Sequence, residues 1–559
     1  MTDFDRIQYE RPDYGRLEQE KEQAITAIRN AETYEQAEAV LLEFQKKFEH
    51  CETMTAVAVI RGYLDGTDEE KSREMAYCIG QSECFDGSAV CEALFDGPFR
   101  NRFEEKYGTF LPESIRRQGT LHTAGEEYIR REQELLAECH QYISNLKFEY
   151  QGELLSASRI GALQASEDDA AAKAAYYAKA KGMAEQGGPV GEYLDRLVKV
   201  RNELARANGF SNYLEYCNVD KERFAYGEKE LAEFCANVRK HILPLVAKMN
   251  EKTRQRLHLD RYTSEDTGKY FPDGNAKPLR DEAFVREKAR EMFENMDPRF
   301  GEIYRGMNEH GYINIGMSDT KVTGIGFTTQ VYDQRTPFIF GNFLGDADSV
   351  SVFLHECGHA LQHRLSMEKY GLTKLYEQVQ DLSELPSKSM ELFSYEYAPL
   401  FFGGDAEKYI TGHLSEFLLE IADYCMFHEF ETFLYTQPEA TVQERIDRFN
   451  ELLEAYHPGV EYVHRDLMAR GSMLYSNATI FRFVRYVISY SLSDLSALYL
   501  AAEFRKDKAR GAALFRKLGE VGGSMDYHGA IAWMGLKPAY SEEVVREAAA
   551  YLRDKLGLD

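Results

Sequence analysis

The sequence predicts a large, mainly α-helical protein with one small β-sheet. Over most of the 559 residues, apolar side chains recur at intervals of three and four, which is the period of one helix face. Only residues 312–343 are rich in β-branched and aromatic side chains broken by glycine, which is typical of strands. An apolar content of 44% and a charged content of 29% fit a globular protein.

The N-terminal part, residues 14–183, is expected to be helical, because proline is nearly absent and the helical period persists. In AEAVLLEFQKKFEH (37–50), for example, Val40, Leu41, Phe44 and Phe48 share one stripe. The clearest break is EQGGPVGEY (185–193). A chain this long exceeds one usual hydrophobic core. We therefore predict an N-terminal helical domain of residues 1–189 and a second domain of residues 190–559.

The second part contains the predicted sheet. A polar loop is expected at 263–282, followed by strand patterns in YINIG, KVTGIGFTTQVYD and PFIFGNF (312–343). From Asp346 onward the pattern is helical almost to the end. The most apolar long stretch, 486–504, carries four serines and an aspartate, which predicts a buried helix and not a membrane span.

The formal net charge of −26 argues against nucleic acid or an anionic membrane as a partner. The nine cysteines are scattered without a CxxC pair, so we expect no disulfide framework and a reducing compartment. The first residues, MTDFDRIQYERPDY, have no apolar core of a signal peptide. Together these features predict a cytoplasmic protein.

The segment FLHECGHALQH (353–363) carries a candidate metal site. Residues four apart on a helix lie about 40° apart around its axis. The side chains of His355 and His359 therefore point the same way and can both bind one metal ion. Glu356 lies about 100° round the helix from His355. It borders the ion without having to ligate it, which is the position of a base that takes a proton from metal-bound water. Either Asp346 or Asp348 can cap this helix.

A catalytic zinc needs a third protein ligand and one open position. His363 follows His359 by four residues, but a straight helix cannot bring three successive histidines at this spacing onto one tetrahedral ion. We expect His363 to be a polar residue or a contact near the site. The better candidate is Glu384 in DLSELPSKSMELFSYEY (381–397), 29 residues after His355, with Pro386 opening a return helix. Glu391, two turns on, could support the site or contact substrate, or could be an ordinary solvated or salt-bridged carboxylate.

The motif HECGH, followed by Glu384 at the start of ELPSKSME, resembles the thimet oligopeptidase / oligoendopeptidase F family of zinc metallopeptidases. TPFIFGNF (336–343) resembles the strand that precedes the zinc helix in that family. TIFRFVRYVISYSLSDLSALYL (479–500) resembles its C-terminal segment, in which a histidine precedes a cluster of tyrosines, and the GGS at 522–524 also fits. The specific motifs cover residues 190 to the end.

This resemblance implies a two-lobed helical bowl with a small sheet next to the zinc helix and a deep central channel that admits oligopeptides. It implies one Zn²⁺ per chain, held by His355, His359 and Glu384, in a catalytic domain of residues 190–559. The implied activity is that of a zinc endopeptidase, with Glu356 activating a zinc-bound water. The strand near 338–343 could bind the peptide backbone as an added strand.

The chain departs from the family in its C-terminal segment. Aligned on the tyrosine cluster, Thr479 takes the place of the family histidine, and in a second register Met473 does. Tyr490 matches a family tyrosine, Val487 replaces another, and Tyr486 lies beside it. Tyrosine hydroxyls serve as oxyanion donors, so we expect this role for Tyr490, with Tyr486 as a second candidate, although both could be core aromatics. The absence of the family histidine removes one transition-state contact, and losing one oxyanion donor costs about 2.7–4 kcal/mol. A slower or differently selective peptidase is therefore expected.

Two other functions compete with this interpretation. One is a zinc-containing peptide-binding protein whose turnover is weak or lost because the histidine is absent. The other is a helical scaffold with a chance motif, whose probability is on the order of a few per cent given 14 histidines.

Arg482 and Arg485 lie in the same C-terminal segment, 479–500. They could supply charge to an oxyanion or a substrate carboxylate, or could be ordinary surface arginines.

Overall fold

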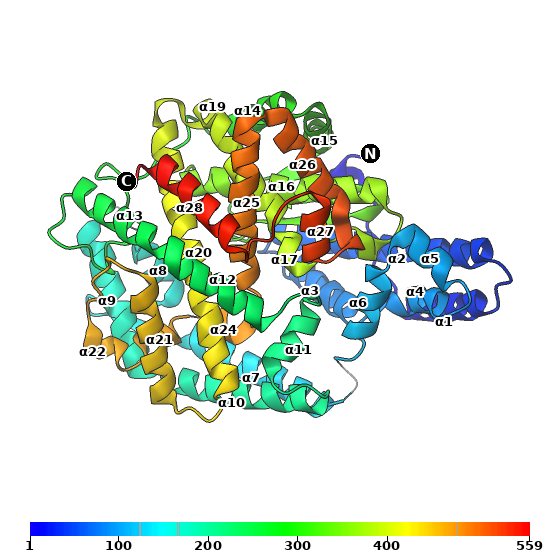
Figure 1. The fold of residues 1–559 in the computed structure, drawn as a ribbon, viewed down its shortest axis with the longest axis horizontal. Helices are drawn as coiled ribbons and strands as arrows, with labels where there is room; N and C mark the ends of the chain where they lie inside the picture. Colours follow the sequence, from blue (N-terminus) through cyan, green and yellow to red (C-terminus); the bar gives the residue numbers. More distant parts are fainter. Residues whose placement is uncertain (122–123, 165, 167, 478) are drawn as a thin grey trace. The chain divides into compact units, whose positions relative to one another are not determined.

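The structure is a computed structural model that describes residues 1–121, 124–164, 166, 168–477 and 479–559. About 70% of the chain is helical, and helices make up most of the ribbon in Figure 1. The predicted mainly helical class is confirmed. Within the described residues, no helix combines the length and the apolar character that crossing a membrane requires.

The chain divides into two compact units that alternate along the sequence. The first consists of Met1–Arg116, Ala276–Ile410 and Ser496–Pro538, and the second of Arg117–Asn275, Thr411–Leu495 and Ala539–Asp559. The predicted break near residue 187 is present as a junction between two helices, but it lies inside the second unit. An N-terminal domain of residues 1–189 therefore stays a prediction.

The helices that lie wholly or mostly in the first unit are α1 (Tyr14–Arg29), α2 (Tyr34–Leu64), α3 (Glu69–Glu83), α4 (Ser88–Phe95), α5 (Arg100–Tyr107), α6 (Phe110–Gln118), α14 (Glu282–Met296), α15 (Pro298–Glu309), α16 (Ala347–Lys369), α17 (Gln380–Ser383), α18 (Leu385–Phe393), α19 (Ala398–Phe402), α26 (Lys508–Val521) and α27 (Tyr527–Trp533). The predicted polar loop at 263–282 precedes α14.

The helices of the second unit are α7 (Glu126–Asn145), α8 (Ala157–Gln164), α9 (Asp169–Gln186), α10 (Gly188–Ala207), α11 (Tyr213–Asp220), α12 (Glu228–His241), α13 (Leu243–Arg256), α21 (Val442–Tyr456), α22 (Arg465–Met468), α23 (Ser472–Tyr475), α24 (Thr479–Arg482) and α28 (Glu542–Leu556). Helices α20 (Ala406–Thr436) and α25 (Ile488–Lys506) each contribute residues to both units. Helix α25 corresponds to the predicted buried apolar stretch.

The predicted strand region forms a three-stranded sheet in the first unit. Its strands are β3 (Ile313–Asn314), β4 (Phe327–Val331) and β5 (Thr336–Phe340), in the order β3-β5-β4. Strand β5 is buried throughout. It runs parallel to β3 and antiparallel to β4. Both edges of β5 are hydrogen-bonded to neighbouring strands. The expectation that the strand near 338–343 binds a substrate peptide as an added strand is therefore wrong. Strands β3 and β4 are the two edge strands, and β4 is paired with β5 on one side only in this sheet.

A second sheet, which the sequence pattern did not predict, interrupts the N-terminal helices. Strands β1 (Lys147–Tyr150) and β2 (Glu153–Ser156) form an antiparallel hairpin. The two loop residues, Gln151 and Gly152, have φ of 52° and 86°. Positive φ at both loop residues is the requirement of a type I′ turn, which matches the twist of the flanking strands. The expectation of uninterrupted helices and a single sheet is therefore wrong here.

Candidate metal centre

Helix α16 carries the histidine pair. Asp346 is its N-cap, and its carboxylate accepts a hydrogen bond from the backbone N–H of Ser349 at 2.9 Å, which decides between the two predicted caps. The helix runs without a break through 353–363 and contacts β4, β5, α18 and α26. As the spacing predicts, His355 and His359 lie one turn apart, with their Nε2 atoms 3.2 Å from each other.

Glu384 approaches the histidines from the junction of two short helices. It is the residue between α17 and α18, and Pro386 lies in the first turn of α18, as predicted. Its Oε2 atom lies 3.3 Å from Nε2 of His355 and 3.3 Å from Nε2 of His359. The hydroxyl of Ser387 donates a hydrogen bond to the same oxygen at 3.0 Å, which fixes the carboxylate.

Gly358 allows α18 to come this close. A Cβ atom at this position would lie 2.6 Å from the carbonyl oxygen of Pro386 and 2.6 Å from Cα of Ser387. Real Cβ atoms do not approach backbone atoms so closely, because interiors are already packed at crystal density. The glycine inside HECGH is therefore the reason that the Glu384 helix can lie against the histidine helix.

The three donor atoms fit a tetrahedral metal ion. Bonds of about 2.0–2.1 Å at the tetrahedral angle separate ligand atoms by about 3.3–3.4 Å. The edges of the triangle formed by His355, His359 and Glu384 measure 3.2, 3.3 and 3.3 Å. Among the described residues, these three are the group of His, Cys, Asp and Glu side chains that could share an ion. Two imidazoles and one carboxylate are ligands that zinc accepts, and they leave a fourth position open.

The electrostatics also favour a cation. Burial lowers the pKa of His355, but its hydrogen bonds to Glu384 and Glu391 outweigh burial and raise that pKa to about 10. Burial raises the pKa of Glu384, but the adjacent His359 and His355 outweigh it and hold that pKa well below its usual range. Two buried carboxylates around one histidine thus require positive charge, either from protons or from a metal ion.

Glu391 supports the site from behind. Its Oε1 atom lies 2.6 Å from Nδ1 of His355, and Nζ of Lys388 lies 3.8 Å from the same oxygen. The side chain is 4% exposed, so the solvated alternative is excluded. A carboxylate bonded to the far nitrogen of a metal-binding histidine fixes the tautomer and the ring orientation. Glu391 therefore presents Nε2 of His355 to the triangle.

Glu356 is held by a residue that the sequence analysis missed. The hydroxyl of Thr328, on β4, donates to Oε2 of Glu356 at 2.6 Å and lies 3.0 Å from its backbone carbonyl oxygen. Glu356 itself is buried on α16 beside His355. The carboxylate is thus tied to an edge strand of the sheet. No sequence motif predicts this contact, because it depends on how the sheet packs on the helix.

His363 lies outside the donor triangle. The side-chain amide nitrogen of Gln330, also on β4, is 2.8 Å from its Nδ1 atom. Burial, together with the nearby His359, lowers the pKa of His363 to about 3, so the ring is neutral near pH 7. This geometry agrees with the expectation of a polar neighbour of the site.

The expected C-terminal site residues belong to the second unit, whereas the donor triangle belongs to the first. The hydroxyls of Tyr486 and Tyr490 are 3.4 Å apart, and the ring of Tyr490 packs on Tyr424 with centroids separated by 5.5 Å. Thr479 opens α24, where its N–H donates to the side chain of Asn477. The roles of Tyr486, Tyr490 and Thr479 in the site stay predictions.

Arg485 is neither a surface arginine nor available to a substrate. It is 0% exposed, and its guanidinium binds Glu228 and Glu431, two carboxylates of the same unit. Its backbone has a φ of 57°, in the left-handed region that non-glycine residues rarely adopt. Both alternatives for Arg485 are therefore corrected, because its buried ion pairs fix the chain just before Tyr486. Arg482 is exposed, as an ordinary surface arginine would be.

The chain is similar to solved peptidase structures over its whole length. A structure described as PZ peptidase A with inhibitor 2 is 27% identical, with a TM-score of 0.86 over 99% of each chain. A putative oligoendopeptidase F is 27% identical, with a TM-score of 0.87 over 100% of this chain and 99% of that one. A putative oligoendopeptidase F from Bacillus anthracis str. Ames, at 23% identity, shares the fold, with a TM-score of 0.81 over 100% and 98%. No curated protein matches the chain.

Two family models match the sequence in succession. Residues 4–122 match the Peptidase M3 N-terminal domain, and residues 162–550 match Peptidase family M3. The second match alone covers more than half of the 559 residues, and it includes all three members of the donor triangle. This protein therefore belongs to Peptidase family M3.

Proposed function

We propose that this protein is a zinc-dependent endopeptidase that hydrolyses peptide bonds in oligopeptides. The observation that carries the proposal is the donor triangle with edges of 3.2–3.3 Å, next to the buried carboxylate of Glu356. One Zn²⁺ per chain would be held by His355, His359 and Glu384. Membership in a peptidase family supports the reaction class.

The residues around the triangle have separable roles. When bound, zinc supplies Lewis-acid chemistry, which makes water nucleophilic near pH 7 and polarises the scissile carbonyl. Glu356 accepts the proton of the attacking water and later delivers it to the leaving amine. Thr328 binds one oxygen of that carboxylate and so holds it in one rotamer. Tyr490, with Tyr486 as a second candidate, would donate a hydrogen bond to the developing oxyanion.

The edge strand β4 is the structure's candidate for binding the peptide backbone. It has one paired side, and it carries Thr328, which reaches Glu356. An extended peptide added to this edge would run past the proposed base. Backbone pairing of this kind gives affinity without reading the side chains.

Partners and location follow from composition. A net charge of −26 disfavours nucleic acid and anionic membranes, which leaves oligopeptides as the proposed partners. All nine cysteines are free thiols, which supports a reducing, cytoplasmic compartment.

The test is metal analysis combined with hydrolysis of a quenched oligopeptide pool, with the products read by mass. We expect one zinc per chain and internal cleavage. Glu356→Gln keeps shape and polarity but cannot accept the proton, so it should retain zinc and peptide binding and lose nearly all hydrolysis. Glu384→Ala should lose zinc while its helix content stays close to that of the wild type.

The outcomes separate the competing functions. Loss of zinc in Glu356→Gln would make that residue a ligand and not the base. Stoichiometric zinc and peptide binding without any product would favour the peptide-binding protein with lost turnover. A wild-type chain that retains no zinc would overturn the proposed metal site.

A further inference from the structure

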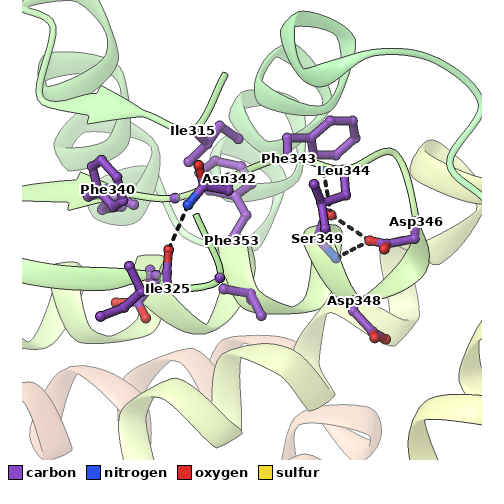
Figure 2. A pocket seen from close by; sticks show the side chains of 16 residues that line it. Ile315, Ile325, Phe340, Asn342, Phe343, Leu344, Asp346, Asp348, Ser349 and Phe353 are labelled. Carbon is purple, nitrogen blue, oxygen red and sulfur yellow. Dashed lines mark hydrogen bonds between the residues drawn. The ribbon is translucent and has the colours of Figure 1, made fainter. Parts of the chain in front are cut away.

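A cavity of about 220 Å³ opens beside Glu356 within the first unit. It lies between the loop at 324–326, the end of β5 with the segment that follows it, and the first turns of α16 (Figure 2). Most of its lining is apolar, and Glu356 is the lining residue that belongs to the proposed catalytic machinery. The main apolar side chains are Ile325, Phe340, Phe343, Leu344 and Val352.

The walls of this cavity are fixed to one another by hydrogen bonds. The amide of Asn342 donates to the backbone carbonyl of Ile325 at 3.1 Å (Figure 2). It also donates to the backbone carbonyl of Val322 at 2.9 Å, so it joins the β5 side to the loop. The backbone N–H of Leu344 donates to the hydroxyl of Ser349 at 2.8 Å, which joins the same segment to α16.

Lys321 braces the cavity from the buried side. Its ammonium donates to the carbonyls of Asn314, Gly316 and Gly341, at 3.2, 2.7 and 2.9 Å. These bonds connect the end of β3 to the end of β5. The cavity is therefore preformed, which is the usual property of a binding pocket.

Gly326 lines the cavity close to the proposed base. A Cβ atom here would lie 2.9 Å from Cγ1 of Val352 and 3.8 Å from Oε1 of Glu356. Val352 and Glu356, which both line the cavity, therefore both lie next to Gly326. A group that fills the cavity therefore lies beside Glu356, whose carboxylate is proposed to accept the proton.

We propose that this cavity receives an apolar side chain of the substrate residue that flanks the scissile bond, and that it sets the cleavage preference. An apolar cavity of about 150 Å³ is enough to bind benzene, so this one has room for an aromatic ring or a branched aliphatic chain. The inference rests on the proposed peptidase function. It adds a side-chain preference to the backbone binding assigned to β4.

The experiment compares two quenched peptides that differ at one position near the cleavage site, leucine in one and alanine in the other. Both kcat/KM and Kd are measured, with zinc content as a control. A hydrophobic pocket discriminates by about 10- to 200-fold for a missing methylene, so we expect the wild type to prefer leucine by at least about tenfold. Val352→Phe places a larger side chain in the cavity lining and should bring the leucine-to-alanine ratio toward one.

Two further variants complete the design. Val352→Ala widens the cavity and should move the preference from leucine toward tryptophan. Val352 is 45% exposed, so both changes are compatible with folding. Met317→Phe is the matched control, since Met317 is 48% exposed in the same unit and is not part of the lining, and it should leave the ratio unchanged.

The outcomes distinguish the two proposals. Hydrolysis with the same ratio in the wild type and both Val352 variants overturns the pocket assignment and leaves the peptidase intact. Absence of hydrolysis, with a leucine preference in Kd that Val352→Phe abolishes, overturns the peptidase and supports the pocket. Absence of both hydrolysis and preference overturns both.

Discussion

At the scale of single residues, Thr328 offers the sharpest test of how Glu356, the proposed base, is held. Its hydroxyl is the hydrogen-bond donor 2.6 Å from Glu356 Oε2. A hydrogen bond to a charged group is worth about 1.5–3 kcal/mol, so Thr328→Val should lower kcat/KM by about 10- to 100-fold. Valine keeps the shape and suits a strand.

The control for this prediction is Thr328→Ser, which keeps the hydroxyl and should recover most of the activity. Zinc content and thermal stability should stay near the wild-type values in both variants, because the side chain is only partly buried. Equal activity in the valine variant and the wild type would show that the hydrogen bond does not matter for the reaction.

A second residue-scale prediction concerns the C-terminal segment. Tyr490→Phe removes one hydroxyl, so it should lower kcat/KM by about 10²–10³ if that hydroxyl is the oxyanion donor, without loss of zinc. Thr479→His introduces the histidine expected in the register aligned on the tyrosine cluster, and it should raise turnover on generic oligopeptides. These effects are read on kcat/KM, which reports transition-state stabilisation. An unchanged value in Tyr490→Phe would remove that residue from the mechanism.

The residues that could be predicted are those whose geometry is local. The pair His355 and His359 follows from helix periodicity, and Glu384 from the spacing shared with a known family. Arg485 was misjudged because its partners, Glu228 and Glu431, lie 257 and 54 residues away in the sequence. Thr328 was missed for the same reason, since its partner is 28 residues away and is reached only through the packing of the sheet on α16.

At the scale of elements, the contact between α16 and α18 decides whether the proposed metal ligands meet. Gly358→Ala would place a methyl group 2.6 Å from the backbone of α18. Overpacking of this kind typically costs about 1–3 kcal/mol. Because α18 begins at the residue after Glu384, its displacement should also weaken zinc binding. We expect a lower melting temperature and a higher zinc Kd.

Gly80 provides the matched control for this substitution. It lies on helix α3 of the same unit, and a Cβ atom there would meet nothing within 4 Å. Alanine is favoured over glycine inside helices by about 1 kcal/mol, so Gly80→Ala should stabilise the protein slightly and leave zinc binding unchanged. A similar response of both variants would contradict the packing argument.

Strands were harder to predict than helices, for a physical reason. The buried strand β5 shows as a run of apolar residues, but its central place in the sheet depends on pairing with β3 and β4, which no local pattern encodes. The hairpin of β1 and β2 is short, and along the sequence it lies between helices α7 and α8. Its one local signal is the dipeptide Gln151-Gly152, a weaker turn pair than Asn-Gly.

At the scale of the whole molecule, the two compact units each combine three segments of the chain. A boundary drawn from one Gly-Pro break cannot reveal such an arrangement, because residues brought together by folding lie hundreds of positions apart. The donor triangle, the cavity and the three-stranded sheet all belong to the first unit. Metal binding is therefore expected to stabilise this unit first.

Removal of the metal tests this expectation. A ligand present at 100 times its Kd stabilises the folded state by about 2.7 kcal/mol, and local opening is governed by such energies. Hydrogen exchange should therefore accelerate in α16 and α18 after chelation, because two buried carboxylates lose their cation. Exchange in α21, a helix of the second unit, should change little. Equal acceleration in α21 and α16 would mean that the two units open together, and no change in α16 would mean that the triangle does not hold the metal.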